Sequence, residues 1–236
     1  MLSDTLLAVR LKHRMGTLEL DVAFEAGGGW TVLFGPSGSG KSTVLRAVAG
    51  FVRPDEGRIS VRTGTRQRVL VDTGTRRFLP AHKRGLRYAG QAAMLFPKMT
   101  VRENLMQAHV GPGREAWLES AIRHFGLGEL ERKMPGELSG GQRQMVSVVR
   151  AAVGEGEILL LDEPFSGLDG RLRDSLIGRL REWLGKTPVV SVTHDVGEAF
   201  LLGAEVVRMS EGRVVRQGAV EDVLGEERER LLGVLA

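Results

Sequence analysis

The chain of 236 residues carries a net charge of +4, and its 42% hydrophobic and 26% charged residues are ordinary for a globular protein of one large or two small domains. The absence of cysteine excludes disulfides and thiolate metal sites and fits a reducing compartment. The sequence shows neither a signal peptide nor an apolar stretch of the roughly 20 residues that span a bilayer, so we expect any membrane role to depend on a partner.

The first part of the chain is predicted to form antiparallel strands. Residues 6–12 and 17–24 alternate between apolar and polar side chains, which predicts two strands joined through residues 14–16. Further short strands are predicted at 57–61 and 68–71. We expect these later strands to lie in an antiparallel layer beside the core.

A glycine-rich loop lies between an apolar run at 30–34 and a helix-forming run at 43–49. Strand, loop and helix form the context that the phosphate-binding motif G-x-x-x-x-G-K-S requires. Glycines let backbone N–H groups turn toward phosphates, and the helix N-terminus adds a partial positive charge. We expect Lys41 to contact the β- and γ-phosphates of a nucleotide and the Ser42 hydroxyl to ligate Mg²⁺; a glycine-rich surface turn is the alternative. The loop consists of Gly35, Pro36, Ser37, Gly38, Ser39, Gly40, Lys41 and Ser42.

Basic residues cluster between positions 66 and 87. A solvated basic edge is the expectation, and contact with nucleic acid or anionic lipid is the alternative. With only one tyrosine and eight phenylalanines in the chain, we expect no base-stacking platform and no nucleic-acid partner. The cluster consists of Arg66, Arg68, Arg76, Arg77, His82, Lys83, Arg84 and Arg87.

The stretch from residue 91 to about 150 is predicted to be a helical insertion. A strand at 85–89 leads into it. A threonine and a glutamate with capping-box spacing predict a helix at 101–109, and a one-sided apolar pattern predicts a second at 114–125. A third helix is predicted at 143–153.

The last part of the chain alternates between strands and helices. Short apolar runs predict buried strands at 158–161 and 188–192, and an amphipathic pattern predicts a helix at 172–184. A hairpin is predicted around residues 211–212 and a short surface helix at 226–235. This alternation predicts an α/β fold with a mostly parallel, helix-covered sheet.

Two acidic residues follow the strand predicted at 158–161. A carboxylate at the end of a strand near the phosphate loop, here Asp162, can hold Mg²⁺. Glu163 would project in a different direction and could polarise an attacking water as a general base. A solvated acidic turn before a helix is the alternative.

A second anion site is predicted before the helix at 143–153. Ser139 and Gln142 have capping-box spacing, which indicates a helix start. Gly140 and Gly141 expose backbone N–H groups at that helix N-terminus, beside the Ser139 hydroxyl. The two interpretations are compatible.

The segments GPSGSGKST, LSGGQ and ILLLDEP occur in this order, and they resemble the ATP-binding-cassette (ABC) ATPases over nearly the whole chain. Gln91 lies where that family has its Q-loop glutamine, and residues 166–169 look like the D-loop. His194 looks like the switch histidine; without the resemblance it would be interpreted as a loop residue after an apolar strand. The resemblance implies the RecA-like fold of P-loop NTPases, with an antiparallel β layer and an inserted helical subdomain.

The resemblance also implies a domain organisation. We expect one ABC ATPase domain over residues 1–236, in which 1–90 and 151–236 form the nucleotide-binding core with its β layer. Residues 91–150 would form the helical subdomain that carries LSGGQ. No C-terminal regulatory barrel is expected.

A head-to-tail dimer that encloses two ATP molecules is implied as well. Glu163 would be the general base, His194 would hold the γ-phosphate and the attacking water, and Gln91 would reach Mg²⁺ and report its state to a partner. Ser42, Gln91 and Asp162 would contact the metal ion. In one subunit, the implied cofactor-binding residues are Gly35, Pro36, Ser37, Gly38, Ser39, Gly40, Lys41, Ser42 and Thr43. The second group, across the dimer interface, consists of Ser139, Gly140, Gly141, Gln142 and Asp169.

The sequence departs from the family in two places. The stretch that usually supplies an aromatic side chain to stack on adenine contains only His13 and Arg14 as candidates here. Met145 replaces a residue that is more often basic.

The region from 78 to 105 looks like bacterial importer cassettes, most of all those for molybdate, sulfate, iron(III) and polyamines. The implied protein is a transporter ATPase at the cytoplasmic face of the inner membrane, with a permease and a substrate-binding protein as partners. A soluble ABC ATPase that drives an assembly other than transport is the alternative. A P-loop kinase is disfavoured because LSGGQ has no role there.

The segment 91–104 is predicted to be the docking surface for the membrane subunit. It combines large apolar residues with Pro97, which prevents one continuous helix from hiding them all. A loop buried against its own helical insertion is the alternative.

Overall fold

The computed structural model describes residues 5–109 and 111–234. Within them, one sheet contains β1 (Thr5–Met15), β2 (Leu18–Ala26), β3 (Trp30–Phe34), β4 (Glu56–Thr63), β5 (Arg66–Asp72), β6 (Arg77–Phe78), β7 (Leu86–Ala89), β8 (Ile158–Asp162), β9 (Val189–Thr193), β10 (Glu205–Ser210) and β11 (Arg213–Ala219). The helices are α1 (Lys41–Ala49), α2 (Val101–Met106), α3 (Arg114–Phe125), α4 (Gly140–Val153), α5 (Gly170–Leu184), α6 (Val196–Leu202) and α7 (Val220–Val234), with 3₁₀ turns at Ala81–Lys83 and Pro135–Glu137.

The parallel part of the sheet runs in the order β10-β3-β9-β8-β7. Every residue of β8 and β9 is buried, as expected for parallel strands covered on both faces. Alternate residues of β8 belong to separate apolar clusters: Leu159 and Leu161 pack with α4 and α5, and Ile158 and Leu160 pack with α1. The helix after the glycine-rich loop and the helix after LSGGQ therefore cover opposite faces of the same strands.

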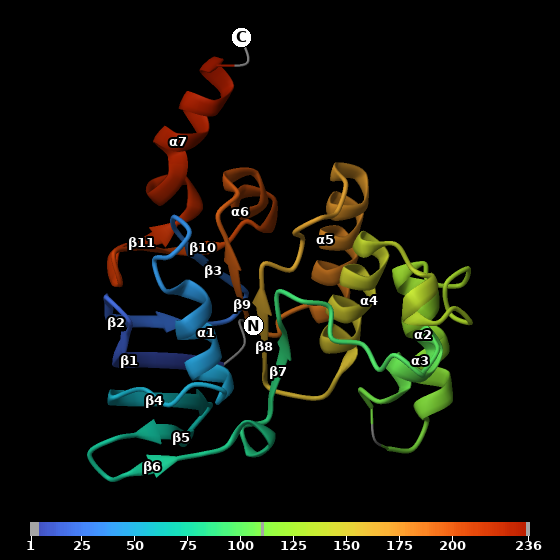
Figure 1. The fold of residues 1–236 in the computed structure, drawn as a ribbon, viewed down its shortest axis with the longest axis horizontal. Helices are drawn as coiled ribbons and strands as arrows, with labels where there is room; N and C mark the ends of the chain where they lie inside the picture. Colours follow the sequence, from blue (N-terminus) through green and yellow to red (C-terminus); the bar gives the residue numbers. More distant parts are fainter. Residues whose placement is uncertain (1–4, 110, 235–236) are drawn as a thin grey trace.

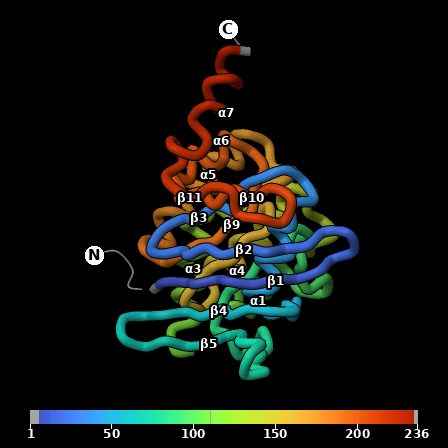
Figure 2. The backbone as a smooth tube through the Cα atoms, turned by 90° about the vertical axis from the view of Figure 1, so that its left-hand side faces the viewer, coloured from blue at the N-terminus to red at the C-terminus, as the bar shows by residue number. Residues whose placement is uncertain are grey.

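The predicted antiparallel layer is confirmed. The strands β6-β5-β4-β1-β2 continue the sheet with antiparallel pairing, and Figure 2 shows β2, β1, β4 and β5 side by side. β1 and β2 are longer than predicted because their antiparallel pairing runs from Leu7 opposite Ala26 to Met15 opposite Leu18.

The helices α2, α3 and α4 group on one side of the sheet (Figure 1). The prediction of a helix to residue 109 is wrong, because α2 ends at Met106, ahead of the glycines and proline at 111–113. The capping box of Ser139 and Gln142 is confirmed. With Ser139 as the N-cap, α4 begins at Gly140 and not at residue 143 as predicted.

The C-terminal helix also differs from the prediction. α7 begins at Val220, six residues before the predicted start at 226, and the predicted end at Leu235 lies outside the described residues. Figures 1 and 2 show α7 projecting from the body of the molecule. No helix within residues 5–109 and 111–234 combines the length and apolarity needed to cross a bilayer.

The basic cluster is only partly the solvated edge that was expected. Arg66, Arg76, Arg77, His82 and Lys83 are exposed, but Arg68 and Arg87 are half-buried. Arg84 is fully buried, so the prediction is wrong for this residue. Its guanidinium donates hydrogen bonds to main-chain carbonyls, which replace the water that a solvated arginine would contact.

Candidate functional site

The glycine-rich loop joins the end of β3 to the start of α1. Gly35 must be glycine, since a Cβ there would lie 2.1 Å from the carbonyl oxygen of Met209 on β10. Gly40 precedes α1 with φ 94°, in the left-handed region that other residues adopt only with strain. The loop is thereby held against the sheet, with the first turn of α1 directly behind it.

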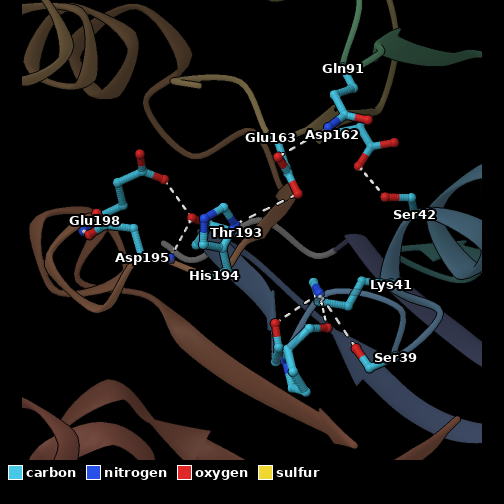
Figure 3. Close-up of polar contacts among 12 residues, drawn as sticks. Ser39, Lys41, Ser42, Gln91, Asp162, Glu163, Thr193, His194, Asp195 and Glu198 are labelled. Carbon is cyan, nitrogen blue, oxygen red and sulfur yellow. Dashed lines mark hydrogen bonds and ion pairs between the residues drawn. The ribbon is translucent and has the colours of Figure 1, made fainter. Parts of the chain in front are cut away.

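The Lys41 ammonium folds back onto this loop. Its Nζ donates hydrogen bonds of 2.8 Å to the carbonyl oxygens of Gly35 and Pro36 and lies 3.4 Å from Ser39 Oγ (Figure 3). Lys41 is 5% exposed. Burial lowers the pKa of the ammonium, and the carboxylates of Glu163 and Asp162 oppose that shift. The loop therefore contains a desolvated cation that a phosphate could attract.

Ser42 and Asp162 meet at the ends of α1 and β8. The Ser42 hydroxyl donates a hydrogen bond of 2.7 Å to Asp162 Oδ1. Asp162 is 3% exposed, and burial raises the pKa of its carboxyl, against the lowering effect of the Ser42 hydrogen bond. A hydroxyl and a buried carboxylate are oxygen ligands of the kind that Mg²⁺ takes, with the remaining ligands from water or phosphate. The pair fits that ion, although no group of three or more acidic, histidine or cysteine side chains among the described residues forms a complete cage.

Three side chains meet at the carboxyl ends of β7, β8 and β9. Gln91 Nε2 donates a hydrogen bond of 3.2 Å to Glu163 Oε2, and His194 Nδ1 lies 3.7 Å from Glu163 Oε1. Figure 3 shows Glu163 between the other two. Glu163 has φ 48°, a left-handed backbone conformation that is strained for glutamate. The structure thus brings together the three residues predicted to be catalytic.

Sequence reasoning missed a hydrogen-bond network beside His194. Thr193 Oγ1 donates 2.6 Å to Glu198 Oε2, and the backbone N–H of Asp195 donates 3.1 Å to Thr193 Oγ1. Asp195 caps α6 by accepting from the Glu198 N–H. Glu198 is buried, and this burial raises the pKa of its carboxyl. The capping spacing of Asp195 and Glu198 is the sequence signal that could have identified the network.

The predicted second anion site lies at the N-terminus of α4. Ser139 Oγ accepts a hydrogen bond of 3.1 Å from the Gln142 N–H, and Gln142 Oε1 accepts one of 3.0 Å from the Ser139 N–H. Gly140 and Gly141 form the first turn, and a Cβ on Gly141 would lie 3.2 Å from the carbonyl oxygen of Gly167. Asp169 caps α5 nearby, with Oδ1 accepting from the Leu172 N–H. Among the described residues, no hydrogen bond joins Ser139, Gly140, Gly141 or Gln142 to the glycine-rich loop.

The stretch that lacks an aromatic residue lies beside the start of α1. Thr43 Oγ1 is 3.3 Å from Met15 Sδ, and Met15 is 44% exposed. Asp55 Oδ2 accepts from the Arg14 N–H at 2.8 Å and lies 3.2 Å from His13 Nδ1. The Arg14 N–H is the main cause that lowers the pKa of Asp55. Met15, which was not among the predicted stacking candidates His13 and Arg14, therefore presents an exposed apolar surface next to the loop.

The segment after Gln91 exposes apolar side chains. Met94 is 72% exposed and Phe96 47% exposed. The buried Asn104 amide holds the loop by donating to the carbonyls of Phe96, Met99 and Thr100, and its Oδ1 accepts from the Phe96 N–H at 2.8 Å. The Arg150 guanidinium lies 5.2 Å from the centre of the Phe96 ring. The segment 91–104 therefore does not form a loop in which all apolar side chains are buried.

Comparison with known proteins gives consistent similarities. The sequence model of the family described as "ABC transporter" matches residues 19–166. The molybdenum import ATP-binding protein ModC of Mesorhizobium japonicum is 39% identical over 222 residues, 92% of this chain and 59% of that protein. ModC of Rhizobium meliloti is 37% identical over 225 residues, 93% of this chain and 62% of that protein. The chain spans about three fifths of the length of these curated relatives.

Two solved structures share the fold. One, described as the ATP-binding subunit of an ABC transporter, superimposes with a TM-score of 0.77 at 25% identity and covers 97% of this chain and 94% of that chain. The other, a dimeric post-hydrolysis state of an ATP-binding cassette bound to ADP and phosphate, has a TM-score of 0.71 at 24% identity over 91% of this chain and 98% of that chain. The predicted fold class is thereby confirmed.

Proposed function

The chain belongs to the ABC transporter family, and on that premise we propose that it binds ATP and hydrolyses it to energise transport through separate membrane subunits. The observation that supports this proposal best is the meeting of Gln91, Glu163 and His194 at three adjacent strand ends. Lys41 on the glycine-rich loop and the Ser42–Asp162 pair lie on the neighbouring elements. Active sites at the carboxyl ends of parallel strands are a general feature of such sheets.

ATP binding would use the whole glycine-rich loop. Residues 35–43 would surround the phosphates with backbone N–H groups, and Lys41 would exchange its two carbonyl acceptors for phosphate oxygens. Mg²⁺, held by Ser42 and Asp162 with Gln91 in reach, would neutralise phosphate charge when it is bound. Met15, with His13 and Arg14 beside it, is the surface on which the adenine would lie.

Hydrolysis would be carried out by the three residues at the strand ends. Glu163, the general base, would accept a proton from the attacking water. His194 would hold that water and the γ-phosphate, since its imidazole already lies beside the Glu163 carboxylate. Gln91 would orient the other carboxylate oxygen through its amide. Thr193 and Glu198 would keep the segment around His194 in place.

The second side of the nucleotide would come from another copy of the chain. Within residues 5–109 and 111–234, the side chains of Ser139 and Gln142 hydrogen-bond only at the start of their own helix, so that Ser139, Gly140, Gly141 and Gln142 would be free to face a partner's phosphates. Asp169 lies next to them at the start of α5. A head-to-tail homodimer is therefore proposed, and the dimeric form of one structural neighbour supports it. We place the core at residues 1–90 and 151–236 and the helical subdomain at 91–150.

We further propose import of an oxyanion of the molybdate class, because the curated relatives are named as molybdenum import proteins. The partners would be a permease that docks on residues 91–104 and a substrate-binding protein, with this chain at the cytoplasmic face of the inner membrane. An ATPase that drives an assembly other than transport is the second candidate. The two exposed apolar side chains of the docking segment could contact a water-soluble partner as well as a permease.

Two measurements test the proposal. Lys41→Ala should weaken ATP binding about a hundredfold and abolish turnover, because a buried charge-assisted contact to phosphate is lost. If the variant binds and hydrolyses ATP as well as wild type does, the glycine-rich loop is not the nucleotide site. Co-purification from membranes with a polytopic partner separates transport from the alternative, for which the chain would be recovered with water-soluble partners alone.

A further inference from the structure

One buried arginine, Arg84, and one half-buried arginine, Arg87, contact the C-terminal ends of the two helices that begin at the candidate phosphate sites. Arg84 is fully buried, and its Nη1 donates hydrogen bonds of 2.7 Å to the carbonyls of Ala47 and Val48 in the last turn of α1. Its Nε donates 2.7 Å to the Leu79 carbonyl. Gly50 makes this approach possible, because a Cβ there would lie 2.7 Å from Arg84 Nε.

Arg87 makes the corresponding contact with α4. From β7, its Nη1 donates 2.6 Å to the Ala152 carbonyl and 3.2 Å to the Gly154 carbonyl, where α4 ends. A Cβ on Gly156 would lie 2.9 Å from Arg87 Cγ, so glycine is required there too. The same strand leads directly to Gln91.

The charges of both arginines are expensive to bury. Burial lowers the pKa of each guanidinium to about 10. Arg84 Nη2 and Arg87 Nε are buried without a hydrogen-bond partner in the part of the chain that the structure describes. The Nη1 hydrogen bonds of both guanidinium groups go to main-chain carbonyls at the C-terminal ends of α1 and α4, which are the negative ends of these helices. These contacts tie the C-terminal ends of α1 and α4 to the segment that leads into and forms β7.

We propose that Arg84 and Arg87 are positioning residues that act on opposite sides of the nucleotide. Arg84 holds α1, and through it Lys41 and Ser42, which would contact the ATP of the same subunit. Arg87 holds α4, and through it Ser139 and Gly140, which would contact the ATP of the second copy. This inference rests on the proposed function, because it assigns the two helix N-termini to one nucleotide bound between two chains.

The test is whether substitution of Arg84 and of Arg87 affects different quantities, namely ATP binding to the single chain and ATP-driven dimerisation. Arg84→Met should weaken ATP binding to the single chain about tenfold, because α1 loses two charge-assisted hydrogen bonds. Arg87→Met should leave that affinity within about twofold but lower kcat and ATP-driven dimerisation about tenfold. Dimerisation is measured by size-exclusion chromatography in a Glu163→Gln background. Binding to the single chain is measured by titration at protein concentrations below those that allow dimerisation.

Controls distinguish positioning from general destabilisation. Lys83→Met removes a neighbouring exposed charge and should change neither quantity. Arg84→Lys and Arg87→Lys should recover part of each loss, since a lysine keeps the charge at the helix end with fewer donors. If the methionine variants unfold, the lysine variants allow the same comparison, with smaller expected losses of ATP affinity and of dimerisation.

Two outcomes would overturn the inference. One is an equal loss of single-chain affinity and of dimerisation in both variants; the other is unfolding of all four substituted chains, which would show a purely structural role. A wild-type chain that neither binds ATP nor dimerises would instead overturn the proposed function. If the wild-type chain binds ATP and dimerises, but the Arg84 and Arg87 variants lose the same quantities to the same extent, the result counts against this inference alone.

Discussion

The Ser42 hydroxyl and the Asp162 carboxylate are joined by a hydrogen bond of 2.7 Å although they lie 120 positions apart in the chain. The bond links the first turn of α1 to the last residue of β8. It holds a carboxylate at a buried position where the pKa of Asp162 is raised, chiefly by burial. Ser42 and Asp162 would hold a divalent cation, and its positive charge would favour the ionised Asp162 carboxylate that burial disfavours.

Asp162→Asn is predicted to separate metal binding from folding. ATP affinity in the presence of Mg²⁺ should fall about tenfold, and ATP affinity in the presence of a chelator should stay within about twofold, because only the metal contact is lost. The unfolding free energy of the ligand-free chain should be unchanged or higher, since a buried charge is replaced by a neutral amide. Titration calorimetry and thermal unfolding measure the two effects, and equal losses with and without Mg²⁺ would contradict the metal assignment.

Glu163→Gln is predicted to retain ATP and stop its hydrolysis. The amide keeps the shape of the side chain but removes the proposed general base, a change that should lower turnover by a factor of roughly 10² to 10⁴. The chain should then accumulate as an ATP-bound dimer in the presence of Mg-ATP, which size-exclusion chromatography detects. Wild type under the same conditions is the control, and near-normal turnover in the variant would show that another group activates the water.

Much of this arrangement could be predicted from the sequence because it depends on local patterns. The buried strands β8 and β9 follow from continuous apolar runs, and the start of α4 follows from the capping box of Ser139 and Gln142. The meeting of Gln91, Glu163 and His194 was predicted only through the family resemblance. No local pattern states that the ends of three strands are neighbours, since strand order is set by the packing of helices on both faces.

Other features depend on tertiary contacts that the sequence does not display. Arg84 belongs to a run of basic residues, and a charge run predicts a solvated edge. Its burial depends on the helix end of α1 and on the space left by Gly50, which are both more than thirty positions away from it. The role of Met15 beside Thr43 depends likewise on how β1 and α1 pack together.

Tyr88 gives a pH-dependent prediction. Burial, with a contribution from the Asp162 carboxylate, raises the pKa of this phenol to about 12, from 10.0 in an unfolded chain. Between these values the native state holds a proton that the unfolded state has lost, so the unfolding free energy should fall as the pH rises through this interval. Below the unfolded pKa the phenol is protonated in both states, and its contribution is constant.

The phenolate absorbance of the chain measures this directly, because Tyr88 is the single tyrosine. The native chain should ionise near 12 and the denatured chain near 10.0. Asp162→Asn should shift the native midpoint downward, since the neighbouring negative charge is removed. Tyr88→Phe, which has no phenolate, is the control for other absorbance changes, and a native midpoint equal to the denatured one would contradict the burial of the phenol.

The proposed docking surface gives the last prediction. Met94 and Phe96 are the most exposed large apolar side chains of the segment 91–104, while Leu95 and Met99 are half-buried. Replacing Met94 and Phe96 with serine should therefore release a membrane partner without affecting the fold, because the loop itself is held by the buried Asn104 amide. ATP affinity, dimerisation and basal ATPase activity should stay within about twofold of wild type, because neither side chain contacts the candidate site. Recovery of the proposed permease in a pull-down from membranes should fall about tenfold or more, as expected when two apolar anchors are lost. Val215→Ser, at another exposed apolar position on β11, is the matched control and should retain the partner. Retention of the partner by the double variant would place the docking surface elsewhere, and loss of the partner together with loss of thermal stability would show that Met94 and Phe96 support the fold.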